Sequence, residues 1–68
     1  MNTTVRNLLD YVNEQALKYD GIRHEIYDAY DLFLTEIENP NANVAHEAKL
    51  CIIEIEELIE AYRICGTL

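Results

Sequence analysis

An apolar residue recurs every seven positions through the first half of this 68-residue chain, and the register continues past the first of its two glycines. The seven-residue set is Val5, Val12, Tyr19, Ile26 and Phe33, and intermediate helical spacing adds Leu9, Ala16, Tyr30 and Ile37. This period places all of these side chains on one side of a helix. The pattern therefore predicts an all-α fold in which a long apolar stripe must pack against another helix.

Two interpretations are open at Gly21. In the first, a helix over residues 4–19 ends there, with glycine in a left-handed C-terminal cap, and a second helix spans 22–38. In the second, one helix continues through Gly21 at a cost of about 1 kcal/mol. The unbroken register favours the continuous helix. Arg23 opposes it, because a continuous helix would place this cation in the middle of the apolar stripe, where an unpaired charge is costly.

The clearest loop lies at residues 38–43, where Pro40 stands among three asparagines. Proline ends a helix, and an asparagine side chain can accept a hydrogen bond from a free amide at the start of the next helix. We expect a helix over 43–65 with Asn43 as its N-cap. Gly66 follows the last apolar position, which is typical of a helix C-terminus.

The helix expected over 43–65 is apolar on two sides. Its main stripe comprises Val44, Ala48, Cys51, Ile55, Leu58, Tyr62 and Cys65, so we expect both cysteines to be buried and reduced. The opposite side carries Leu50, Ile53, Ala61 and Ile64. A helix that is apolar on two sides is usually covered on both. These four residues therefore predict an interface with a second copy or with a docked partner.

The helix lengths allow an antiparallel helical hairpin or a three-helix bundle within a single domain, residues 1–68. A continuous first helix would overhang the hairpin and require a second chain to cover it. A break at Gly21 would let the first segment fold back and complete a three-helix bundle. Because a chain of this size buries a small core, we expect a homodimer that forms a larger bundle.

Thirteen acidic and five basic residues give a net charge of −8. This charge repels nucleic-acid phosphates and anionic lipid surfaces, so we expect neither direct nucleic-acid binding nor membrane association. The sequence shows no secretory signal and no apolar run long enough to span a bilayer. We therefore expect a cytoplasmic protein.

The acidic residues form two clusters with helical spacing. The clusters are Asp28 and Asp31 in the middle of the chain, and Glu54, Glu57 and Glu60 in the last helix. Carboxylates at this spacing are typical of a solvated helix side, and they also suit a basic partner surface.

Enzymatic chemistry has little support in the sequence. The chain has no serine, no glycine-rich phosphate loop, and no histidine at helical reach of either cysteine. A magnesium-dependent nucleotide hydrolase would need both acidic clusters to line one pocket, whereas their helical phase turns them away from the core. We expect no catalytic residue, no metal and no cofactor.

The pattern favours a small acidic α-helical regulator or inhibitor that acts by occluding a target protein. This interpretation rests on an analogy of size and charge with inhibitors carried by phages and mobile elements. Tyr11, Tyr27 and Arg23 would add to the contact surface, since tyrosine and arginine are common at interfaces. The alternative is a nucleic-acid mimic that blocks a basic DNA- or RNA-binding protein, in which the carboxylates rather than the aliphatic side chains carry the affinity.

Overall fold

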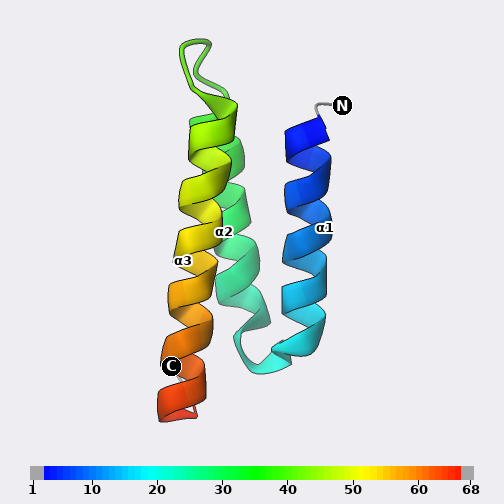
Figure 1. Cartoon of the computed structure of the whole chain (residues 1–68), viewed down its shortest axis with the longest axis vertical. Helices are drawn as coiled ribbons and strands as arrows, with labels where there is room; N and C mark the ends of the chain where they lie inside the picture. The colour runs from blue at the N-terminus through cyan, green and yellow to red at the C-terminus, as the bar shows by residue number, and fades with distance from the viewer. Residues whose placement is uncertain (1–2, 67–68) are drawn as a thin grey trace.

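Three helices pack against one another in the computed structural model, which describes residues 3–66 (Figure 1). Helix α1 spans Thr3–Lys18, α2 spans Arg23–Glu36, and α3 spans Val44–Cys65. A 3₁₀ turn, η1 (Asp20–Ile22), joins α1 to α2. Each helix runs antiparallel to the one before it, and the bundle measures 38 × 17 × 15 Å. The all-α three-helix bundle predicted as one of the two architectures is confirmed.

The chain breaks at Gly21, so the continuous helix is wrong. Tyr19 leaves the helical conformation with φ −120° and ψ 64°, and the Ile22 amide donates to the Tyr19 carbonyl at 3.1 Å. Gly21 does not have a positive φ, so the left-handed cap expected there is also wrong. Gly21 instead lies close to α3: a Cβ built on it would lie 2.5 Å from the Tyr62 hydroxyl oxygen, so a larger residue here would make the Tyr62 side chain shift.

The break also explains how Arg23 avoids the core. It is the first residue of α2, and its side chain is exposed. Its guanidinium Nη1 lies 3.4 Å from the carboxylate of Asp20 in the preceding turn. The change of direction at η1 therefore removes this cation from the stripe that a straight helix would have buried.

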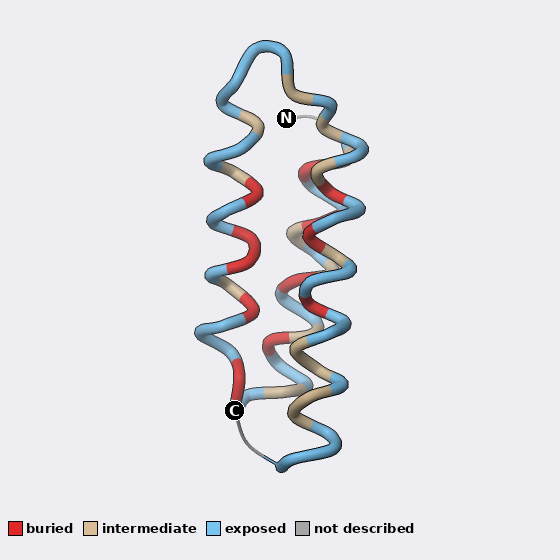
Figure 2. The backbone as a smooth tube through the Cα atoms, turned by 90° about the vertical axis from the view of Figure 1, so that its left-hand side faces the viewer, coloured by how far each residue is buried: buried red, intermediate tan, exposed pale blue. Residues whose placement is uncertain are grey.

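All three helices and the turn contribute to one core. Its buried side chains are Val5, Leu8, Val12, Ala16, Ile22, Ile26, Ala29, Tyr30, Phe33, Ala48, Cys51 and Ile55. The buried positions follow the inward-facing side of each helix (Figure 2). Because α1 folds back beside α2 and α3, the chain covers the first part of its own stripe, and no second chain is needed there.

Local chemistry sets both ends of α3 as predicted. The Asn43 side chain accepts a hydrogen bond from the His46 amide at 3.1 Å. At the other end, Gly66 has a φ of 74°, and its amide donates to the Tyr62 carbonyl at 2.7 Å. A left-handed residue of this kind satisfies a carbonyl that the helix leaves free, and only glycine adopts it without a Cβ penalty.

The last turn of α3 projects beyond the η1 turn, and no other helix of the described residues 3–66 lies beside it there (Figure 1). Cys65 is consequently exposed, and the expectation that both cysteines are buried is wrong for this one. Cys51 is buried as predicted, because it lies in the middle of α3, where α3 packs against α2. The apolar stripe of α3 is thus longer than the bundle that covers it.

Candidate functional site

The three helices differ strongly in charge. Helix α1 carries two bases and two acids and is neutral overall. Helix α2 carries one base against four acids, and α3 carries two bases against five, so each has a net charge of −3. The negative charge of the bundle is therefore concentrated on the two helices that run side by side along its α2–α3 face.

A groove of about 220 Å³ lies on that face between α2 and α3. The buried side chains of Ala29, Phe33 and Cys51 line it, together with Leu32 of α2 and Leu50 of α3. The two leucines are 52% and 45% exposed, respectively. The remaining lining residues are three glutamates, Glu36, Glu47 and Glu54. The α2–α3 groove, defined by these eight residues, is apolar at its base and acidic at its edges.

Further acids extend the groove edges in one direction along the bundle. On α2, Asp28 and Glu25 precede Leu32 by four and seven residues and are exposed. On α3, Glu54 and Glu57 follow Leu50 by four and seven residues and are exposed as well. Positions four and seven residues apart lie on one side of a helix. Because α2 and α3 are antiparallel, both helices present a leucine followed by two acids in the same spatial direction.

The glutamates of the groove have no cationic partner within residues 3–66. The ion pairs in this part of the chain join Arg23 to Asp20 and Arg63 to Glu60, both at 3.4 Å and both exposed. Exposed pairs of this kind contribute only about 0–1 kcal/mol. A cation from another molecule would therefore not have to displace an ion-pair partner within residues 3–66 to reach these carboxylates.

Cys51 at the base of the groove is a packing residue. Its thiol donates to the Ala29 carbonyl at 3.6 Å and so links α3 to α2. Burial, with a smaller contribution from the negative charge of Glu54, raises the pKa of the Cys51 thiol to about 11. The thiol is therefore protonated at neutral pH, and it lacks the thiolate character that a nucleophilic cysteine needs.

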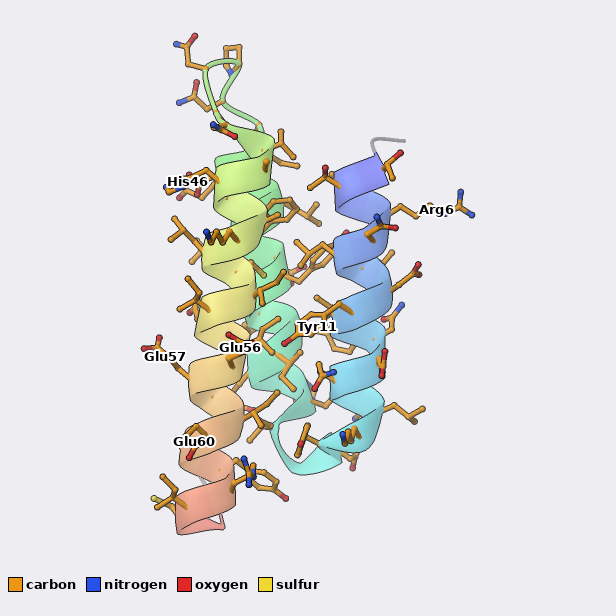
Figure 3. All side chains as sticks on the ribbon, viewed as in Figure 1. Arg6, Tyr11, His46, Glu56, Glu57 and Glu60 are labelled. Carbon is orange, nitrogen blue, oxygen red and sulfur yellow. The ribbon has the colours of Figure 1, made fainter. Side chains whose placement is uncertain are left out.

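The predicted acidic residues are all at the surface. Asp28, Asp31, Glu54, Glu57 and Glu60 are exposed, but only Glu54 lines the groove. The side chains of Glu57 and Glu60 point away from α1 (Figure 3). Glu60 also pairs with Arg63 of its own helix. Of the predicted acidic set, Glu54 therefore lines the groove, and Asp28 and Glu57 lie farther along its two edges. Asp31 and Glu60 are exposed on α2 and α3 outside the groove lining.

The residues of the predicted aliphatic interface also lie in different environments. Leu50 lines the groove, whereas Ile53 and Ile64 lie on the exposed side of α3, at 43% and 73% exposure. Ala61 is half-buried. Helical spacing aligns Leu50, Ile53 and Ile64 along one side of α3, so these residues continue the apolar surface from the groove toward the projecting end of the helix.

Two of the three remaining interface candidates make contacts within the chain. The Tyr27 hydroxyl donates to Asn13 Oδ1 at 2.6 Å and joins α2 to α1. Arg23 pairs with Asp20 beside the turn, as described above. Both side chains retain an exposed surface, but each already makes a contact within the chain.

Tyr11, the third candidate, lines a second groove of about 260 Å³ between α1 and α3. The other lining residues are Thr4, Asn7, Leu8, Ala48 and Ile52. Tyr11 and Glu56 lie on the facing sides of α1 and α3 (Figure 3). Desolvation raises the pKa of the Tyr11 phenol, and the negative charge of Glu56 adds to this effect. Among residues 3–66, no charged residue lines this α1–α3 groove, so its described lining differs in chemistry from that of the α2–α3 groove.

Sequence patterns alone missed Leu32, Glu36 and Glu47. Leu32 lies off the apolar stripe of its helix, and an aliphatic side chain outside the stripe is a signal that could have drawn attention to it. The glutamates carry no such signal, because a single glutamate near a helix end is common. Their importance follows from the packing of α2 against α3, which brings them to the edges of one groove.

Within residues 3–66, no three histidine, cysteine, aspartate or glutamate side chains come together in an arrangement that could hold a metal ion. None of the helices in this range is both long enough and apolar enough to cross a membrane. Comparison with known proteins gives no match, whether to a protein-family model, to a curated protein or to a solved structure.

Proposed function

We propose that this protein is a small acidic regulator that binds another protein and inhibits it by occluding a functional surface. One observation carries the proposal: Leu32 and Leu50, from two neighbouring helices, are about half exposed at a groove whose edges bear only acidic charge. Apolar side chains gathered at a groove are a common feature of binding sites. The leucines would supply affinity, and the acids would steer a basic target toward them.

Two further features of the proposal concern the state of the protein in the cell. Both cysteines are free thiols, which suits the reducing cytoplasm. The exposed Ile53 and Ile64 on the outer side of α3 offer a surface for a homodimer, which would cover the part of α3 that the bundle leaves open.

A nucleic-acid mimic is the second candidate. Exposed carboxylates on two adjacent helices, such as Asp28 and Glu57, favour it because a basic nucleic-acid-binding groove would attract them. In that case binding would depend on the carboxylates and would weaken steeply with salt. The leucines of the groove would contribute little.

Affinity capture from the native cell, with matched variants as bait, separates the two candidates. For the regulator, Leu32→Ala/Leu50→Ala should lose the captured protein, whereas Leu17→Ala should retain it. Leu17 is a suitable control because it is 85% exposed on α1, away from the groove.

A nucleic-acid mimic should show the opposite dependence. Glu36→Gln/Glu47→Gln/Glu54→Gln would abolish capture, and the double alanine variant would retain it. Glu14→Gln on neutral α1 controls for the loss of charge. Capture of the same proteins by wild type and by every variant, including Ile53→Ala/Ile64→Ala on the exposed side of α3, would contradict both candidates.

A further inference from the structure

We infer that the occupant of the α2–α3 groove is a basic amphipathic helix of the partner protein, which docks as a fourth helix of the bundle. This inference rests on the proposed function and deepens it, because it states which chemistry the partner must present. The groove geometry, the placement of the acids and the contrast with the second groove support it.

The groove has the shape that a helix requires. It lies between two antiparallel helices that pack against each other along the 14 residues of α2. Two helices packed in this way leave a furrow into which the apolar stripe of another helix fits, as in four-helix bundles. Leu32 and Leu50 project from opposite edges of this furrow. A partner helix of about four turns would match the length of α2.

The charges at the groove edges specify the flanks of the partner helix. Each edge carries glutamates beside its leucine: Glu36 on α2, and Glu47 and Glu54 on α3. A helix lying in the groove would place the residues beside its apolar stripe next to these carboxylates, as at the flanking positions of coiled coils. Lysine or arginine at those positions would pair with the glutamates, which have no ion pair within residues 3–66.

A second copy of this chain is a poor occupant of the same groove. A two-fold dimer across this face would bring the same surface of both copies together. The glutamates of one copy would then lie against those of the other, and like charges across an interface are unfavourable. Charge thus selects a cationic partner for the groove, while a dimer through the distant Ile64 would leave the groove free.

The α1–α3 groove lacks the acidic edges of the α2–α3 groove. Its volume is similar, and Leu8 and Ile52 give it an apolar part. Its polar lining consists of neutral side chains, Thr4, Asn7 and Tyr11. A basic helix would find no row of carboxylates along both edges there. The difference in charge, rather than in size, singles out the α2–α3 groove.

Fluorescence anisotropy with synthetic peptides tests the inference. The probe is a labelled peptide of about 16 residues made of leucine and lysine, with the leucines spaced three and four apart to form one apolar stripe. One comparison peptide has the same composition in scrambled order. A second keeps the leucine spacing but replaces every lysine with glutamate. Circular dichroism of each protein variant verifies that the bundle is folded.

We expect the leucine–lysine peptide to bind and to become helical, and both comparison peptides to bind at least about tenfold more weakly. Leu32→Ala and Leu50→Ala should each weaken binding by about tenfold, since each removes apolar contact area. Glu36→Gln/Glu47→Gln/Glu54→Gln should weaken binding and reduce its dependence on salt. Leu17→Ala and Glu14→Gln should leave the affinity within about twofold of wild type.

Equal binding of the scrambled peptide would overturn the inference, because attraction would then depend on charge alone. Equal weakening by Leu17→Ala and Leu50→Ala would overturn it as well. So would a wild-type dimer, measured by light scattering, that Leu50→Ala dissociates, because the second copy would then occupy the groove.

Affinity capture as described above, with Ile53→Ala/Ile64→Ala as an additional bait, distinguishes failure of this inference from failure of the proposed function. If a captured partner depends on Ile53 or Ile64 and not on Leu32 or Leu50, the regulator remains and the groove inference fails. If capture is the same for all variants, the proposed function itself fails.

Discussion

The two sides of α3 carry similar residue types but have different environments. On one side, Ala48, Cys51 and Ile55 are buried in the core. On the other, Leu50, Ile53 and Ile64 remain exposed. The difference arises because α1 and α2 both pack against the first side, and residues 3–66 contain no further helix to cover the second. An apolar helix side can therefore be buried, but whether it is buried depends on the number and placement of the other helices.

The largest expected effect compares two isoleucines of α3. Ile55→Ala should lower the free energy of unfolding by about 3 kcal/mol, because it removes a fully buried side chain and leaves a cavity. Ile53→Ala, the matched control on the exposed side, should lower it by less than about 1 kcal/mol. Urea unfolding followed by circular dichroism measures both, and equal losses would contradict the assignment of inner and outer sides.

The next largest effect tests the contact between Gly21 in the η1 turn and Tyr62 near the end of α3. Gly21→Ala should cost about 1–3 kcal/mol, because the added Cβ would collide with the Tyr62 hydroxyl and force the ring to shift. In a double-mutant cycle, Tyr62→Phe should relieve part of this cost, since it removes the nearest atom. Independent, additive losses would show that the turn and α3 do not meet in this way.

Alkaline pH should destabilise the folded protein by ionising the buried thiol of Cys51 in α3. The pKa of the Cys51 thiol is raised from 9.0 to about 11 in the folded protein, so folding favours the protonated form. The stabilisation from this group is complete below pH 9 and is lost as the pH rises toward 11. The free energy of unfolding should therefore fall over that range, and Cys51→Ala should reduce the fall.

The Cys51→Ala variant should keep the part of the fall in the free energy of unfolding that comes from Tyr11 and Tyr30, whose pKa values burial also raises.

Thiol labelling at pH 8 provides a direct comparison of the two cysteines. Exposed Cys65 should react rapidly, and buried Cys51 should react only as fast as the bundle opens. Equal labelling rates in the native protein would contradict the packing of α3 against α2.

The smallest expected change in stability concerns the projecting end of α3. Ile64→Glu and Leu17→Glu should each change the free energy of unfolding by less than about 0.5 kcal/mol, because both side chains are largely exposed. The two variants should differ in oligomeric state, which light scattering measures as molecular mass. The proposed homodimer predicts that wild type and Leu17→Glu are dimers and that Ile64→Glu is a monomer, and a wild-type monomer at micromolar concentration would contradict it.

Much of the fold could be predicted because local chemistry encodes it. The cap at Asn43 and the left-handed Gly66 depend on neighbouring residues of the same helix, so the bounds of α3 could be predicted from the sequence. The candidate site was less predictable. Leu50 and Glu54 were identified, whereas Leu32 was not, because nothing in α2 alone shows that this leucine lies across a groove from α3.

By itself, the sequence determined three helical segments, their inward-facing sides and a strongly acidic surface, because periodicity and charge are properties of residues close together in the chain. Only the tertiary structure decided the reversal at Gly21, where the turn packs close to Tyr62 of α3. It also decided the exposure of Cys65, since no other helix within residues 3–66 reaches the end of α3. The α2–α3 groove was decided in the same way, since two separate helices build it. Each of these features depends on the packing of segments far apart in the chain, and local patterns do not specify that packing.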